Sequence, residues 1–191
     1  MSEATAGVSR GQFLHNTAKG GLVLVGSGGV LAAAEGVAFA SGPTKSDIKT
    51  LQAAYVAESL AVVVYSAIIA NFSAFKHPKL QNKDYFVAAL KNEKDHKAFL
   101  ASALGSKTPA QPTFKIPASV TKTGQSLLNT GVALETAFVE AYLGAVETFS
   151  SLDLKMVAAK VAANEATHFS FFDAAAGAGP KGNLCLLYTS D

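Results

Sequence analysis

The chain has 191 residues, of which 49% are hydrophobic and 16% are charged, and its net charge is +2. This length is enough for one domain with a buried core and some appended segments. Lys and Arg are scattered along the chain rather than gathered in a stripe, so nothing in the charge pattern favours a nucleic-acid partner. We exclude that class of function.

The first 40 residues have the pattern of an export signal rather than that of a folded domain. Arg10 and Lys19 flank an apolar stretch rich in Gly and Ala, residues 21–34, and Ala38-Phe39-Ala40 before Ser41 is a small-x-small cleavage site. We therefore predict a leader over residues 1–40 and a mature protein that is exported to the periplasm or the extracellular space.

The export route and the cleavage of the leader have alternatives. Residues 9–14 resemble a twin-arginine signal, but Gly11 stands where the second Arg belongs, so the general secretory route stays open. An uncleaved membrane anchor is disfavoured by the Gly content and by Glu35, because about 20 clean apolar residues are needed to span a bilayer. We expect no stable membrane insertion after cleavage.

The mature domain, residues 41–180, is expected to be all-α, because apolar residues recur there at helical rather than alternating spacing. The first helix is predicted over residues 46–71, with Ser46 as its N-cap. One stripe of this helix carries Tyr55, Glu58, Val62, Tyr65 and Ile69.

Three further helices follow along the chain. The second is predicted over residues 83–104 and stops at Gly105. The third ends at Phe149 and starts at Gly124 or Gly131, because Thr and Gly residues near its start leave that boundary open. The fourth follows Ser151 as N-cap and ends before Gly177.

The connections between the helices predict the topology. About ten residues join the first two helices and only a few join the last two, so each pair forms an antiparallel hairpin. The Pro-rich stretch between the hairpins, residues 106–119, reaches about 45 Å when extended, whereas a 22-residue helix is about 33 Å long. This predicts a ferritin-like four-helix bundle of two antiparallel helical hairpins joined by one long crossover.

The last residues, 181–191, are predicted to be a disordered tail. Residues 185–191 resemble the in-frame translation of a sequencing-library adapter, which makes Cys185 foreign to the domain. A lone Cys forms no internal disulfide in any case, so the core, with or without a metal, must hold the domain together.

The pattern Asn-Glu-x-x-His-x-x-Phe occurs twice, at residues 92–99 in the second helix and at residues 164–171 in the fourth. Residues three apart share a helix face, so Glu93 and His96 point the same way, and so do Glu165 and His168. A single copy of this pattern more often lies on an exposed helix face. Two copies with matched surroundings favour metal ligands that point into the bundle core.

Such a bundle forms a site for two metal ions from a Glu-x-x-His on each of two helices and a Glu on each of the other two. On the first helix the single candidate is Glu58, whose Ala, Leu and Val neighbours make its burial costly without a partner or a metal. The alternative is a carboxylate at the edge of the apolar stripe.

The third helix offers Glu135, Glu140 and Glu147. Glu135 is followed after seven residues by Tyr142, and the same spacing from Glu to Tyr recurs in the first helix. Counted from the turn between the last two helices, Glu135 is also level with Glu165, whereas Glu140 is about 7 Å away along the helix. We predict Glu135 as the ligand and the other two as exposed residues.

Tyr65 and Tyr142 are candidates for a supporting role at the site. Their hydroxyls suit a hydrogen bond to a ligand carboxylate or to a bound oxygen species. Ordinary core packing is the alternative, and the sequence leaves both interpretations open.

Residues 51–177 resemble the exported ferritin-like family that includes the desiccation-related proteins. The matching segments are Glu58, Glu93-x-x-His96-x-x-Phe99-Leu100 with Leu104-Gly105, Leu134-Glu135 with Ala141-Tyr142-Leu143-Gly144-Ala145, and Ala163-Asn164-Glu165-Ala166-x-His168. The resemblance implies the fold and a ligand set of Glu58, Glu93, His96, Glu135, Glu165 and His168.

Four carboxylates and two imidazoles form an oxygen-rich, moderately hard ligand set, which suits iron or manganese better than copper or structural zinc. We predict two iron ions, with manganese as the alternative, and O2 or H2O2 as the small-molecule partner. The most economical function is oxidation of Fe(II) or removal of peroxide in stress protection.

Two non-enzymatic alternatives stay open. The domain is then either a structural or desiccation-protective bundle that a metal only stabilises, or an interaction module with an empty site. The chain has more apolar residues than an ordinary core needs, namely residues 62–64 with Phe169, Phe171 and Phe172. They predict either a homodimer contact or a thick core.

Overall fold

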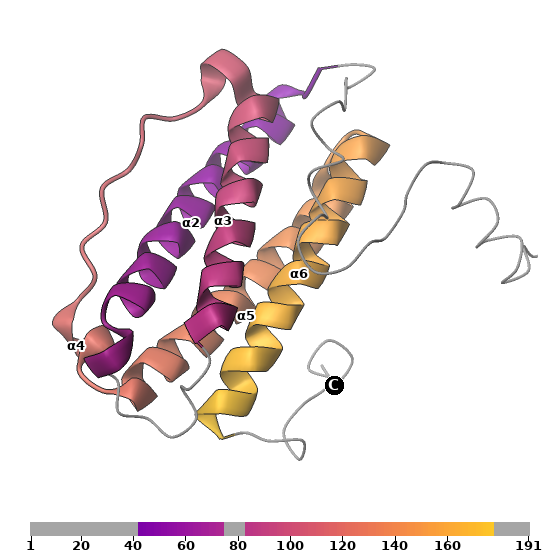
Figure 1. The fold of residues 1–191 in the computed structure, drawn as a ribbon. Helices are drawn as coiled ribbons and strands as arrows, with labels where there is room; N and C mark the ends of the chain where they lie inside the picture. The colour runs from indigo at the N-terminus through magenta and orange to yellow at the C-terminus, as the bar shows by residue number, and fades with distance from the viewer. Residues whose placement is uncertain (1–41, 75–82, 178–191) are drawn as a thin grey trace, which may run out of the picture. The chain divides into compact units, whose positions relative to one another are not determined.

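The computed structural model describes residues 42–74 and 83–177, and within these ranges the chain is all-α. Four long helices run through it, as Figure 1 shows: α2 (Lys45–Ala70), α3 (Lys83–Leu104), α5 (Gly124–Thr148) and α6 (Leu152–Ala176). The short helical segments are η2 (Phe72–Ala74), η3 (Gly105–Lys107) and α4 (Ala118–Thr121). The predicted leader, the loop around Pro78 and the predicted tail lie outside the described residues.

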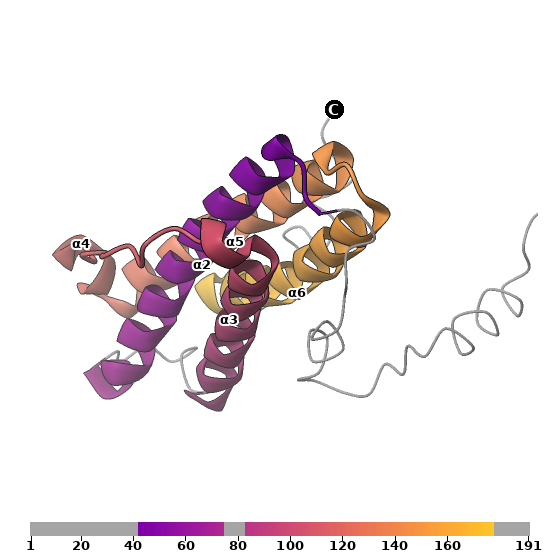
Figure 2. The same cartoon turned by 90° about the horizontal axis from the view of Figure 1, so that it is seen from above.

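The four long helices pair as two hairpins. α2 packs along α3 and α5 packs along α6, while α2 also contacts α5 across the bundle (Figures 1 and 2). The connection from α3 to α5 passes over α2, where Gln52 Nε2 donates to the carbonyl of Lys107 at 2.8 Å and Tyr55 lies within hydrogen-bond reach of Gln111. The predicted arrangement of two hairpins and one long crossover is confirmed.

The helix ends follow local capping rules, with one correction. Ser46 is not the N-cap of α2: Thr44 is, because its side chain accepts from the backbone N–H of Asp47 while the Asp47 carboxylate accepts from Thr44 in return. Thr123 caps α5, so that helix starts at the earlier of the two predicted positions. Ser151 caps α6, and Gly177 ends it at φ 105°, as predicted.

Two core clusters lie on either side of a layer of Glu and His residues. We call one the aromatic half, because the rings of Tyr65, Phe86 and Phe172 fill it. We call the other the alanine half, because Ala145 and Ala158 lie among its larger apolar residues. Of the surplus apolar residues, Val64, Phe171 and Phe172 belong to the aromatic half or pack against it, whereas Val62, Val63 and Phe169 are half-buried outside both clusters, so the thick core accounts for half of them.

The predicted stripe of α2 is only partly correct. Tyr55, Glu58 and Tyr65 are buried, but Val62 and Ile69 are half-buried, and Val64 and Ile68 are buried in their place. α2 is surrounded on several sides by α3, α5 and the crossover, so its buried face is broader than a single stripe.

α2 is also long and apolar enough to cross a membrane by length and composition, with a mean hydropathy of 1.8. The core helix of a soluble bundle passes the same test. Here the helix packs along α3 and carries Glu58, fully buried, at its centre, so we interpret it as a core helix.

Candidate metal centre

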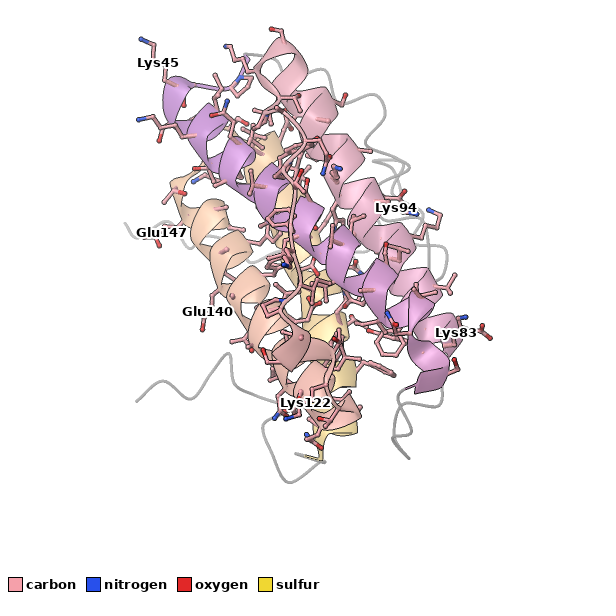
Figure 3. The ribbon with its side chains drawn as sticks, turned by 90° about the vertical axis from the view of Figure 1, so that its left-hand side faces the viewer. Lys45, Lys83, Lys94, Lys122, Glu140 and Glu147 are labelled. Carbon is pink, nitrogen blue, oxygen red and sulfur yellow. The ribbon has the colours of Figure 1, made fainter. Side chains whose placement is uncertain are left out.

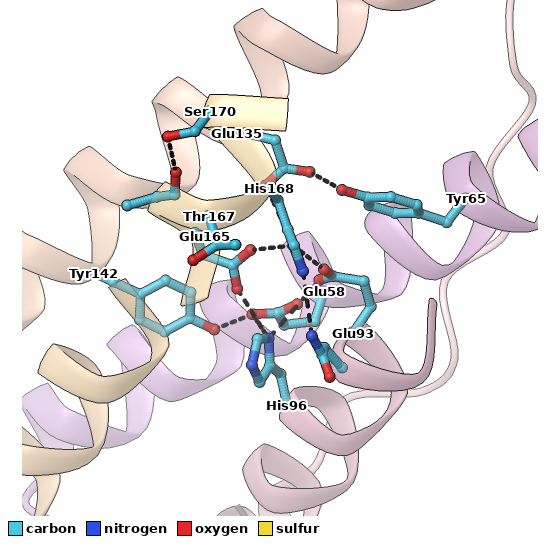
Figure 4. Close-up of polar contacts among 12 residues, drawn as sticks. Glu58, Tyr65, Glu93, His96, Glu135, Tyr142, Glu165, Thr167, His168 and Ser170 are labelled. Carbon is cyan, nitrogen blue, oxygen red and sulfur yellow. Dashed lines mark hydrogen bonds and ion pairs between the residues drawn. The ribbon is translucent and has the colours of Figure 1, made fainter. Parts of the chain in front are cut away.

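All six predicted ligands lie together in the layer between the two halves of the bundle (Figure 4). Each of the four long helices contributes to this layer, and each of the six side chains is at most 4% exposed. They are Glu58 from α2, Glu93 and His96 from α3, Glu135 from α5, and Glu165 and His168 from α6.

The six residues form two overlapping groups, each able to hold one metal ion. One group is Glu58, Glu93, His96 and Glu165, and the other is Glu93, Glu135, Glu165 and His168. Within each group one ligand atom per residue lies within 4.8 Å of every other. Glu93 and Glu165 belong to both groups, so the two groups share two carboxylates.

Both imidazoles turn Nδ1 into this layer. His96 Nδ1 lies 2.9 Å from Glu165 Oε1 and 3.6 Å from Glu58 Oε1. His168 Nδ1 lies 2.8 Å from Glu93 Oε1 and 3.2 Å from Glu165 Oε2. Each imidazole is therefore closest to the glutamate of the other copy of the motif, which brings the two hairpins together at the site.

The buried polar atoms of this layer fit divalent cations. Among the described residues, Oε2 of Glu58, Glu93 and Glu135 is buried without a hydrogen-bond partner, and Glu93 Oε1, Glu165 Oε1 and His96 Nδ1 have only the imidazole–carboxylate contacts given above. Leaving so many buried acceptors unpaired is costly. Two divalent cations would balance the charge of four carboxylates and take up these lone pairs, so the donor set fits a metal pair.

The pKa values show how protons are distributed when no metal is bound. Burial raises the pKa of Glu58 well above its ordinary value, and burial with the charges of Glu165 and Glu93 raises that of Glu135 to about 9. Burial opposes the ionisation of Glu93, but the two imidazoles outweigh it and lower its pKa to about 2. Burial also lowers the pKa of His168, yet Glu165 and Glu93 raise it to about 10. Metal binding here displaces protons.

The two tyrosines bridge α2 and α5. Tyr65 of α2 donates its hydroxyl hydrogen bond to Glu135 Oε1 at 2.6 Å, and Tyr142 of α5 donates to Glu58 Oε1. Burial and the nearby carboxylates raise the pKa of both phenols, so both stay protonated as donors. Each bond occupies one carboxylate oxygen and leaves the other, Oε2, without a hydrogen-bond partner for a metal.

The other glutamates of α5 lie elsewhere. Glu140 and Glu147 are exposed and point away from the bundle in Figure 3, whereas Glu135 is fully buried. The lysines labelled in the same view also lie on the outside. The structure thus places only Glu135, of these three residues, in the layer.

Two asparagines were not predicted as site residues. Asn92 Nδ2 lies 3.3 Å from His168 Nε2, on the side of the ring opposite to the layer. Asn164 holds the same position in the second copy of the motif, and its Oδ1 is buried without a hydrogen-bond partner. The repeated Asn before each Glu was the available signal for this supporting position.

Comparison with known families agrees with this geometry. A family model described as a ferritin-like domain matches residues 46–178, which is more than half of the chain and spans all four long helices. The curated proteins and the solved structures gave no match. The match includes all six residues of the buried layer. The chain therefore belongs to the ferritin-like domain family.

Proposed function

We propose that the protein carries a dinuclear iron centre, with manganese as the alternative metal, and that it oxidises Fe(II) with H2O2 or O2 as the electron acceptor. The observation that carries this proposal is that Glu93 and Glu165 belong to both ligand groups. Shared carboxylates hold two ions close enough to act together in one reaction.

When bound, a pair of Fe(II) ions would supply two electrons, with each ion becoming Fe(III), and these with two protons would convert H2O2 into two water molecules. The chain contributes the surroundings of that reaction. Tyr65 and Tyr142 fix the rotamers of Glu135 and Glu58, and the burial of the layer excludes bulk water. Asn92 lies at Nε2 of His168, on the far side of the ring, so Nδ1 is the ring nitrogen that faces the layer.

Metal content tests the ligand set. Residues 41–180, reconstituted with Fe(II) or Mn(II), should bind about two ions per chain by elemental analysis. Glu58→Ala and Glu135→Ala each remove a residue of a single group and should leave about one ion, whereas Glu93→Ala should remove both. Glu140→Ala is the matched control on the surface of α5 and should keep the full content. Full occupancy in a double variant of His96→Ala and His168→Ala would falsify the assignment.

Turnover separates this function from the structural alternative. Iron-loaded protein should oxidise added Fe(II) repeatedly, with consumption of H2O2 or O2, and Glu93→Ala should lose that activity. A protein that binds two ions, melts at a higher temperature with them and oxidises no Fe(II) beyond the bound pair would be a metal-stabilised bundle instead.

The cellular setting of the proposal is export and stress protection, as in desiccation-related proteins. It is supported by the sequence of residues 1–40 and by the motifs through which residues 51–177 resemble desiccation-related proteins. Mass spectrometry of protein secreted by a suitable host should find Ser41 at the new N-terminus. Recovery of only full-length, membrane-bound protein would contradict cleavage.

A further inference from the structure

The alanine half contains a cavity of about 240 Å³ between the four long helices. Its walls are almost entirely Ala, Leu, Val and Phe side chains. The polar lining residues are Thr50 near the end of the bundle, and His96 and Tyr142 at the Glu/His layer. A water molecule needs several polar partners, so this cavity suits an apolar occupant better than water.

The lining residues of the cavity extend along the helices. Its lining runs along α2 from Thr50 to Ala57 and along α5 from Phe138 to Phe149, which at 1.5 Å per residue is about 10 to 16 Å. Its inner end reaches His96 and Tyr142, and the Tyr142 hydroxyl bonds to Glu58. A bound molecule would therefore extend from the end of the bundle to the candidate metal centre.

The mouth of the cavity lies between α2 and α5. Ala53 on α2 and Ala141 on α5 line the cavity and are both exposed to solvent. Because both side chains are small, they leave the seam between these helices open. An amphiphile can keep its polar end in water there while its chain is buried.

We propose that this cavity binds the alkyl chain of a small amphiphile, with the methyl end against His96 and Tyr142 and the polar end at the seam between α2 and α5. An engineered cavity of about 150 Å³ holds benzene, so a cavity of this volume has room for on the order of ten carbons. The proposal goes beyond Fe(II) oxidation and does not depend on it, since the lining is complete without a metal.

Decanoate and decanol, used below their micelle-forming concentrations, are the probes. Titration calorimetry of the domain should show one site per chain with a negative heat-capacity change. Ala158→Leu fills the cavity from α6, where Ala158 is 2% exposed, and should weaken binding at least tenfold. Ala159→Leu makes the same change on the exposed face of that helix and should leave binding unchanged.

Ala145→Leu, which fills the cavity from α5, provides a second blocking variant in case the first misfolds. Failure of both probes to bind the wild-type protein would overturn the proposal and make the cavity a packing defect. Equal binding by Ala158→Leu and Ala159→Leu would also overturn it, because the probes would then adsorb elsewhere. The same titrations of metal-free and of Mn(II)-loaded protein measure binding of the probe independently of metal binding. Metal binding itself is tested by the Glu93→Ala variant.

Discussion

On one side of the Glu/His layer the bundle is filled by aromatic rings, and on the other side it is lined by small residues around a cavity. In the aromatic half, Phe172 packs against the rings of Tyr65, Phe86 and Phe171, with centroids about 6 Å apart. In the alanine half, the buried residues Ala145 and Ala158 line the cavity instead. The two ligand groups are nearly symmetric, but their surroundings are not.

This difference bears on access to the two groups of ligands. The ring of His168 lies 5.7 Å from Tyr65 and 6.2 Å from Tyr85, edge to face, so aromatic packing closes that side of the layer. His96 lines the cavity. We infer that molecules larger than water reach the site from the His96 side, and that the aromatic half supplies rigidity.

Removing one aromatic side chain from each half should give the largest effect and a direct comparison. Phe172→Ala empties a fully buried, ring-packed position and should cost about 5 kcal/mol of unfolding free energy. Phe149→Ala removes a ring that already borders the cavity, and therefore loses fewer contacts, so we expect about 3 kcal/mol. Urea denaturation of the metal-free variants measures both. Equal losses would show that the cavity does not loosen its half.

The second prediction concerns the hydrogen bonds between Asp47 and Ser150 at the end of the alanine half. Asp47, in the first turn of α2, accepts hydrogen bonds from the backbone and hydroxyl of Ser150, in the turn between α5 and α6. It also completes the capping box with Thr44. Asp47→Ala removes the acidic half of the capping box and leaves the donors of Ser150 and Thr44 unpaired, which should cost about 2 kcal/mol. Asp84→Ala, at an exposed position in the first turn of α3, is the control and should cost about 0.5 kcal/mol.

The same residue makes stability depend on pH. Burial opposes the ionisation of Asp47, but the hydrogen bonds of Ser150 and Thr44 outweigh it and lower the pKa from 3.8 to about 2. A lowered pKa adds stability above the unfolded value of 3.8, and that stability is lost as the pH falls towards about 2. The difference in unfolding free energy between the wild type and Asp47→Ala should therefore shrink over this range. A constant difference would contradict the role of the charge.

The helices and the inward-facing Glu and His residues were predictable from the sequence, because both follow from local rules. Ser151 and Gly177 are strong end signals, and the repeat at residues 92–99 and 164–171 fixes which faces point inward. The error at Ser46 came from choosing among nearby Thr and Ser residues. Only Thr44 has an acidic residue three positions later that returns its hydrogen bond.

The partners across the bundle were not predictable from periodicity. The spacing from Glu to Tyr recurs in two helices but does not say which carboxylate each Tyr contacts, and Tyr65 donates its hydrogen bond to Glu135 on the opposite hairpin. Periodicity gives the face of a residue and not its neighbour on another helix. The cavity is harder still to predict, because side chains from several helices surround it and none of these residues is unusual by itself.

The last prediction compares added volume in the two halves along one helix, α5. A Cβ at Gly131 would lie 2.3 Å from two ring atoms of Phe172 and 2.6 Å from its Cγ, so the whole ring must move. Phe172 is fully buried and packed on other rings, which leaves it no room. Overpacking costs about 1 to 3 kcal/mol, and the better helix propensity of Ala returns up to about 1 kcal/mol. Gly131→Ala should therefore lose about 1 to 2 kcal/mol.

Ala145→Leu adds three carbons in the other half of the same helix. Its side chain would enter the cavity of about 240 Å³, so no neighbour has to move. Filling a cavity commonly stabilises a protein by about 0.5 to 2 kcal/mol, and we expect a gain near the lower end because the fit is not optimised. Thermal and urea unfolding of both variants should thus show changes of opposite sign. A loss in Ala145→Leu as large as that in Gly131→Ala would mean that the alanine half is as tightly packed as the aromatic half, and would remove the physical basis for a ligand chain beside His96.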